Sequence, residues 1–128
     1  MKLLLDTCAA LWWWDGSSRL SAAAEAALEE QSNEVALHQV TFLEIAIKHS
    51  RGKLGIPKAP QALVAEALEE YELAYHRLGD RDIVRLATLP LHHRDPFDRL
   101  LIAHALEHSL TVVTSDSKFA EYGVSVLW

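Results

Sequence analysis

Four carboxylates in this sequence stand where an ordinary solvated helix face does not explain them: Asp6, Glu44, Asp98 and Asp116. Asp6 directly follows a short apolar run, and Asp116 comes two residues after another. Clustered carboxylates repel one another unless a cation balances them, and oxygen ligands without cysteine favour Mg²⁺ or Mn²⁺. Two such ions about 4 Å apart can activate a water and stabilise the leaving oxygen of a phosphodiester. These residue types therefore predict metal-dependent phosphodiester hydrolysis, provided that the fold brings them together.

The alternation of strands and helices indicates how the four residues could meet. Short apolar runs predict five strands, at residues 2–5, 35–40, 73–76, 110–114 and 124–128. Helical segments are predicted at residues 21–31, 41–51, 60–71, 79–87 and 95–108. This order favours a mostly parallel sheet with helices on both faces, in which ligands bind beyond the carboxyl ends of the strands. We therefore expect one α/β domain over residues 1–128, with Asp6, Glu44 and Asp116 at one edge of its sheet.

Helix capping offers a structural explanation for some of these acids. Asp95 suits the N-cap and Asp98 the third position of its helix, but the sequence does not show at which edge of the sheet that helix begins. Glu44 occupies the last position of a possible capping box that begins at Thr41, where a carboxylate meets the helix dipole favourably. Asp116 could be a turn aspartate. The sequence alone does not decide between capping and catalysis for these residues.

The composition limits the class of protein. A chain of 128 residues suits one domain. Its 12 basic and 18 acidic residues give a net charge of −6, so the whole molecule repels phosphate unless bound cations reduce that charge. The single cysteine, Cys8, excludes an internal disulfide and is expected to be a buried thiol. No apolar run approaches the roughly 20 residues of a membrane span, so we expect a cytoplasmic protein without a membrane segment.

Four short motifs together resemble the PIN-domain family, most of all the VapC-type toxins of bacterial toxin–antitoxin pairs. They are LLDT at residues 4–7, FLEIAIK at 42–48, HRDPFDRLLIA at 93–103 and VTSD at 113–116. The resemblance covers essentially the whole chain. It implies a PIN-like three-layer α/β/α fold with a central, mostly parallel sheet of about five strands. It also implies a Mg²⁺- or Mn²⁺-dependent ribonuclease. In this family the helix that carries the third acidic residue begins at the active-site edge of the sheet.

The same resemblance implies roles for individual residues. Asp6, Glu44, Asp98 and Asp116 match the acidic quartet of the family, with Asp6, Asp98 and Asp116 as the metal ligands. Many relatives carry Asn where this chain has Asp116. Positions that bond the acids or cap the helix are matched by Thr7, Asp95 and Thr114. The candidates for contacts with RNA phosphates are Lys48, Arg51, Lys53, Arg94 and Arg99. Independently of the resemblance, His92 and His93 could form a metal site, but because no other histidine has a suitable spacing, we expect them to contact phosphate or to lie in a surface loop.

The expected partners are an RNA substrate, a cognate antitoxin and a second copy of the chain. Trp12, Trp13 and Trp14 cannot all face one core from one helix, because consecutive helical residues diverge by about 100°. We therefore expect at least one of them to contact another chain. The main alternative is a catalytically silent PIN-like module that binds RNA or protein and whose acids only cap helices. A phosphotransfer receiver is a further alternative, but it would need an aspartate after the third strand and a lysine after the fifth.

Overall fold

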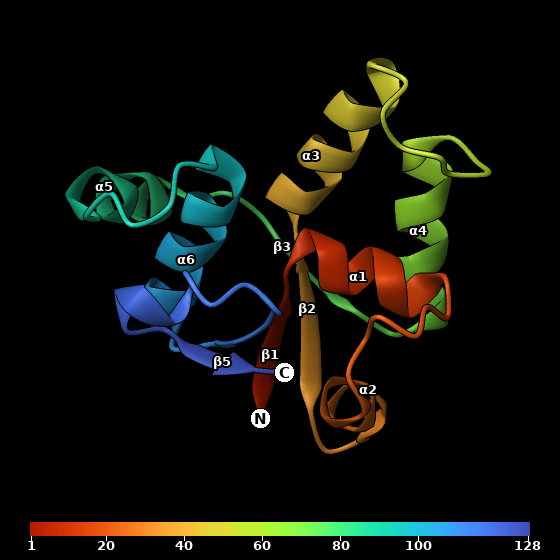
Figure 1. Cartoon of the computed structure of the whole chain (residues 1–128), viewed down its shortest axis with the longest axis horizontal. Coiled ribbons are helices and arrows are strands. Elements are labelled where there is room, and N and C mark those ends of the chain that lie inside the picture. The colour runs from red at the N-terminus through yellow and green to blue at the C-terminus, as the bar shows by residue number, and fades with distance from the viewer.

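A five-stranded, wholly parallel sheet runs through the centre of the protein (Figure 1). The computed structural model describes all 128 residues. The strands are β1 (Lys2–Leu5), β2 (Glu34–His38), β3 (Ala74–His76), β4 (Thr111–Val113) and β5 (Ser125–Leu127). Their order in the sheet is β3-β2-β1-β4-β5, so the direction of winding reverses between β1 and β4. Open parallel sheets bind ligands at the carboxyl ends of the strands where this reversal occurs.

Six α-helices connect the strands. They are α1 (Thr7–Trp14), α2 (Ala22–Glu29), α3 (Gln39–Ser50), α4 (Pro60–Glu70), α5 (Asp80–Thr88) and α6 (Pro96–His108), and a short 3₁₀ helix spans Ala120–Tyr122. The predicted α/β class is therefore confirmed, and the bounds of the predicted elements differ from the observed ones by at most two residues. The sequence pattern does not predict α1, because its residues are apolar almost throughout and show no helical periodicity. No helix combines the length and apolar character needed to cross a membrane.

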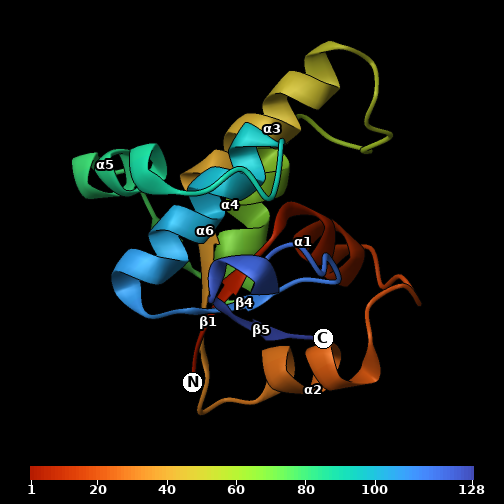
Figure 2. The same cartoon turned by 60° about the vertical axis from the view of Figure 1, so that its left-hand side comes forward.

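The sheet separates two apolar cores, as the pleat of β1 requires. Leu3 and Leu5 point to one face, where they pack with residues of α1, α2, α3 and α4, and Leu4 points to the other face, against α6. Figures 1 and 2 show these two helical layers on opposite sides of the strands. Full burial of each leucine contributes roughly 1.5–3 kcal/mol. The layers therefore fix β1, and with it Asp6 at its carboxyl end.

The start of α3 differs from the expected capping box. The helix begins at Gln39, and the His38 side chain is its N-cap, with Nδ1 accepting a hydrogen bond from the Val40 amide at 2.9 Å. Glu44 therefore lies in the second turn and caps nothing. It is buried, with 4% of its surface exposed. The capping explanation for Glu44 is wrong, because an imidazole from β2 has taken the capping position.

The start of α6 follows the predicted pattern. Asp95 is the N-cap, Pro96 is the first helical residue, and the Asp95 carboxylate accepts a hydrogen bond from the Phe97 amide at 2.8 Å. Because α6 leads into β4, which is parallel to β1, the helix must begin at the carboxyl edge of the sheet and end at the amino edge. Asp98 therefore lies at the same edge as Asp6.

Candidate active site

The four predicted acids converge on the carboxyl edge of the sheet from four different elements. Asp6 is the N-cap of α1, Glu44 lies inside α3, Asp98 lies in the first turn of α6, and Asp116 follows β4. Their charges interact. Glu44 and Asp116 both raise the pKa of Asp6, and Glu44 and Asp6 both raise the pKa of Asp98. The fold thus gathers residues that are up to 110 positions apart in the sequence.

Asp6 is nearly fully buried. Its Oδ1 atom accepts a hydrogen bond from the Ala9 amide at 2.6 Å, which fixes the carboxylate at the start of α1. Burial raises the pKa of Asp6, whereas hydrogen bonds from Thr114 and Ala9 lower it less strongly. A raised pKa means that the ionised form is unfavourable here without a compensating cation.

Asp98 is the most strongly perturbed acid of the site. Burial raises its pKa to about 7, and the charges of Asp95, Glu44 and Asp6 add to this effect, while His93 opposes it. Around neutral pH, a fraction of the metal-free molecules therefore carries a proton on Asp98. A divalent cation would replace that proton and relieve the repulsion.

Glu44 has a charge partner of its own. Its Oε2 atom lies 2.5 Å from Nζ of Lys48, one turn further along α3, and its Oε1 atom accepts a hydrogen bond from Thr7 Oγ1 at 2.9 Å. Thr7 in turn lies 3.2 Å from the Thr41 hydroxyl. The hydrogen bond to Glu44 raises the pKa of Lys48. Lys48 thus neutralises an acid of the site, and Thr7 bonds an acid as its motif position implies.

His93 contacts two acids of the site, a role that its sequence pattern does not indicate. Only 9% of its surface is exposed, so the expected surface-loop position is wrong. Its Nε2 atom lies 2.8 Å from Asp116 Oδ2 and 3.1 Å from Asp98 Oδ2, and its Nδ1 atom accepts a hydrogen bond from the Asp95 amide at 3.0 Å. The available signal was its position two residues before an N-cap aspartate, where a side-chain acceptor can close a short turn.

Asp116 is held at both carboxylate oxygens. Oδ2 contacts His93, and Oδ1 accepts a hydrogen bond from the Lys118 amide at 2.9 Å. The Asp116 amide donates to Thr114 Oγ1 at 3.0 Å. The turn-aspartate reading of Asp116 is therefore correct for one oxygen, while the other oxygen faces Asp98 and His93.

The basic residues predicted to contact RNA differ in how many contacts they make within the chain. Arg51, Lys53 and Arg94 are exposed. Arg99 instead donates hydrogen bonds to the carbonyl oxygens of Leu89 and Pro90 and to the Tyr122 hydroxyl, which ties the preceding loop to α6. The three exposed cations form no salt bridge within the chain.

Cys8 lies beside the acids and is exposed, so the expected buried thiol is wrong. Partial burial and the nearby Asp6 charge raise its pKa. The four acids offer carboxylate oxygens as ligands, and the pKa values of two of these acids, Asp6 and Asp98, are raised. Such a set fits a hard divalent cation of the Mg²⁺ or Mn²⁺ type.

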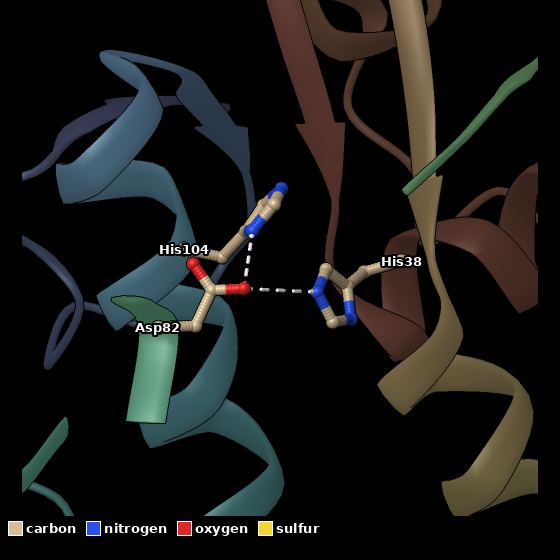
Figure 3. A group of neighbouring side chains, drawn as sticks. All are labelled: His38, Asp82 and His104. Atoms are coloured by element: carbon tan, nitrogen blue, oxygen red, sulfur yellow. Dashed lines mark hydrogen bonds and ion pairs between the residues drawn. The ribbon is translucent and has the colours of Figure 1, made fainter. Parts of the chain in front are cut away.

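A second polar cluster lies between β2, α5 and α6 and was also missed. Asp82 is almost completely buried, and its Oδ2 atom lies 3.0 Å from His104 Nδ1 and 3.9 Å from His38 Nε2 (Figure 3). His104 Nε2 lies 2.9 Å from His76 Nδ1. The spacing of His104 and His108, four residues apart on α6, was the available signal.

The tautomer of His38 indicates what this second cluster does. Its Nδ1 atom accepts the Val40 amide, so the ring proton is on Nε2 and points toward Asp82. That nitrogen offers no lone pair to a metal ion. The Asp82 carboxylate also accepts the Gly79 amide at 3.1 Å. The cluster therefore anchors α5 to the body of the protein through a buried carboxylate.

Comparisons with known proteins agree with this geometry. The PIN domain family model matches residues 3–124. Ribonuclease VapC22 of Mycobacterium tuberculosis (strain ATCC 25618 / H37Rv) is 30% identical over 124 residues, which cover 93% of this chain and 90% of that protein.

Solved structures share the fold at lower identity. VapBC2 from Rickettsia felis, bound to a promoter DNA fragment, has a TM-score of 0.73 at 16% identity, with 98% of this chain and 97% of that chain covered. DNA-bound VapBC from Salmonella typhimurium has a TM-score of 0.73 at 17% identity, with 98% and 96% covered. FitAcB from Neisseria gonorrhoeae has a TM-score of 0.64 at 22% identity, with 97% and 95% covered.

Proposed function

The chain belongs to the PIN domain family, and on this basis we propose that it is a divalent-metal-dependent endoribonuclease, the toxin of a type II toxin–antitoxin pair. The similarity to a ribonuclease VapC over nine-tenths of both chains supports the reaction class. The VapBC assemblies among its structural neighbours support an antitoxin partner. Such an enzyme would act on RNA in the cytoplasm.

One observation carries the metal dependence of this proposal. Asp98 has its pKa raised to about 7 inside a group of acids that includes Asp6 and Glu44. A group of acids that only capped helices would gain from ionisation near the positive helix ends, and its pKa values would be lowered. The raised pKa values of Asp6 and Asp98 instead fit a site that is completed by a cation.

The roles of the chain's own residues follow from their contacts. Asp6 and Asp98, with Asp116, would hold Mg²⁺ or Mn²⁺. When bound, the ion supplies Lewis-acid stabilisation of the charge that develops on the phosphate. Glu44, whose charge Lys48 balances, is left with a carboxylate that can orient a water toward the phosphorus. Arg51, Lys53 and Arg94 are exposed cations that can attract and position the RNA backbone.

The antitoxin site that we propose is a groove of about 580 Å³ between α1, the loop before α4, and α4 itself, and half of its lining residues are apolar. Trp12, Trp14, Leu54, Ile56 and Tyr71 are among the residues that line it. A partner segment with apolar side chains would pack on these apolar residues of the groove. Trp12 and Trp14 are therefore the tryptophans proposed to contact another chain.

A second copy of the chain has a separate surface available. Because α5 directs Asp82 inward, its apolar residues Ile83 and Val84 face outward, and Val84 is 68% exposed. Leu78, just before α5, is exposed as well. Exposed apolar groups on one face favour association. We propose that the homodimer forms through α5, which leaves the groove of Trp12 and Trp14 to the antitoxin.

Cleavage assays on the antitoxin-free protein test the proposed function. We expect cleavage of labelled RNA that requires Mg²⁺ or Mn²⁺ and stops in excess EDTA. A folded, freshly purified protein that cleaves none of a broad panel of RNAs at any concentration of either metal would favour the alternative, a catalytically silent binding module.

A further inference from the structure

His93 is the one nitrogen-bearing side chain in contact with two of the acids. Its Nε2 atom, together with oxygens of Asp98 and Asp116, forms a group of possible ligand atoms that all lie within 4.8 Å of one another. Distance alone would therefore allow His93 to be a metal ligand. The hydrogen bonds of the ring decide between a ligand and another role.

The Asp95 amide determines where the ring proton is. A backbone N–H can only donate, so the 3.0 Å hydrogen bond from the Asp95 amide requires an unprotonated Nδ1 on His93. A neutral imidazole then carries its proton on Nε2. The lone pair of Nδ1 is used by the amide, and Nε2 has none. His93 in this arrangement has no nitrogen free to bind a metal ion.

The proton on Nε2 has two acceptors. It points to Asp116 Oδ2 at 2.8 Å and to Asp98 Oδ2 at 3.1 Å. The ring itself is held in place, because the His93 amide donates to the Tyr122 hydroxyl at 2.7 Å and the ring packs edge-on against Phe119. A fixed donor thus joins the loop before α6 to the loop after β4.

We propose that His93 is a positioning residue, a hydrogen-bond donor that holds Asp116 beside Asp98 and orients both carboxylates toward the divalent cation. This role rests on the proposed function. Groups that hydrogen-bond to metal-binding carboxylates and histidines orient them, and their loss typically weakens metal affinity or activity by about 10- to 100-fold. Asp95 then acts twice, since its carboxylate caps α6 and its amide selects the tautomer of His93.

Two substitutions separate the donor of His93 from its acceptor. His93→Asn keeps a short side-chain acceptor for the amide two residues on, as asparagine provides in turns, but it has no donor that reaches Asp116. His93→Gln extends an amide N–H toward the former position of Nε2 and gives up the close acceptor. His92→Asn is the matched control, because His92 is the exposed neighbour that contacts neither acid.

The first readout is Mn²⁺ affinity, measured by electron paramagnetic resonance or calorimetry in the absence of RNA. We expect Mn²⁺ binding to weaken about 10-fold in His93→Asn, to stay within about 3-fold of wild type in His93→Gln, and to be unchanged in His92→Asn. Equal Mn²⁺ affinity in wild type and a folded His93→Asn would overturn the positioning role. A wild-type protein that bound no Mn²⁺ would overturn the proposed function, and the role of His93 with it.

The second readout is the protonation of the ring, from long-range ¹H–¹⁵N correlation spectra of the wild-type protein. We expect His93 Nε2 to remain protonated when the protein is saturated with Mg²⁺. An unprotonated Nε2 in the Mg²⁺ form, or direct ¹⁴N coupling from His93 to bound Mn²⁺, would show that His93 is a ligand and would overturn the proposal.

Discussion

Nζ of Lys48 lies 2.5 Å from Oε2 of Glu44, and no other acid of the site is paired with a lysine in this way. The pair spans one turn of α3, with a buried carboxylate and a lysine that is half exposed. Lysine in this position reduces the charge that the metal-free protein must tolerate at the carboxyl edge of its sheet. The ion pair and a bound cation therefore stabilise the same group of acids.

Lys48→Met tests this relationship. The substitution keeps the apolar stem and removes the ammonium group, so it leaves Glu44 buried without its charge partner. We expect the metal-free protein to lose about 1–3 kcal/mol of unfolding free energy, and saturation with Mn²⁺ to restore part of it. Thermal unfolding should thus show a larger Mn²⁺-induced rise in Tm in Lys48→Met than in wild type. Lys53→Met, at an exposed lysine, is the control, and an equal rise in all three proteins would contradict the account.

Asp95→Ser separates capping from catalysis at the start of α6. Serine keeps an N-cap acceptor for the Phe97 amide, so the free energy of unfolding should hold to within a few tenths of a kcal/mol. The Asp95 amide still donates to His93, because the backbone is unchanged. We expect RNA cleavage to stay close to the wild-type rate. A loss of cleavage as deep as that of Asp98→Asn would show that the Asp95 carboxylate takes part in the reaction.

The Asp82 cluster predicts acid sensitivity. Burial lowers the pKa of His38 to about 4, and burial also lowers the pKa values of His76 and His104. A histidine whose folded pKa lies below its unfolded value of 6.5 stabilises the fold when neutral, so this stability is lost as the pH falls from about 6.5 toward 4. For His38 the loss should reach about 1–3 kcal/mol.

His38→Asn isolates that contribution, because asparagine can still accept the Val40 amide at the start of α3 and does not titrate. Urea unfolding between pH 7 and pH 4.5 should show a shallower loss of unfolding free energy in His38→Asn than in wild type. The slopes of unfolding free energy against pH are compared, and not the absolute values, because the variant also loses the packing of the imidazole ring. Identical slopes would contradict the assignment of acid sensitivity to His38.

Trp14→Phe tests the antitoxin groove. Phenylalanine keeps an aromatic ring and removes the buried, unpartnered Nε1 donor, so the free protein should be as stable as wild type or slightly more stable. If the cognate antitoxin packs on the Trp14 ring, which lines the groove, calorimetry should show affinity reduced by about 5- to 10-fold, because the phenylalanine ring is smaller. Trp13→Phe is the control, since Trp13 packs on Tyr71 and is absent from the groove lining. Unchanged affinity in Trp14→Phe would exclude this contact.

The elements that position Asp6 and Asp98 could be predicted from the sequence because local chemistry specifies them. Lys2–Leu5 is an apolar run that only a strand covered on both faces explains, and Asp95 followed by Pro96 marks a helix start. A parallel sheet then places Asp6 and Asp116 at the same edge. The order of the strands and the edge at which Asp98 lies become clear only from the observed pairing and from the connection of α6 to β4.

The missed features depend on contacts between distant segments. His93 and Asp116 are 23 residues apart, and His38 and Asp82 are 44 residues apart, so no spacing rule connects them. The capping box expected at Thr41 is absent for a related reason: the preceding strand supplies an imidazole, His38, that caps α3 three residues earlier. Local motifs predict a helix end only when no neighbouring side chain competes for it.

Asp98→Asn should leave a folded protein, and its stability can be predicted. The folded pKa of Asp98, about 7, lies above its ordinary value of 3.8, so in the metal-free wild type this group makes stability fall as the pH rises from about 4 to about 7. Removing the charge should therefore raise the unfolding free energy at pH 8 in EDTA by about 1 kcal/mol. Asp15→Asn, at an exposed acid, should show no such gain. A less stable Asp98→Asn would contradict the repulsion inferred for the site.

The most direct test of the central claim is RNA cleavage by wild type and Asp98→Asn, followed on the same preparations as Mn²⁺ binding. We expect cleavage by wild type to rise with the same Mn²⁺ midpoint as binding and to disappear in excess EDTA. Asp98→Asn, folded and antitoxin-free, should lose at least about 100-fold in cleavage together with its Mn²⁺ affinity. Undiminished cleavage in EDTA, or wild-type cleavage by Asp98→Asn, would show that the reaction does not depend on a metal held by Asp98.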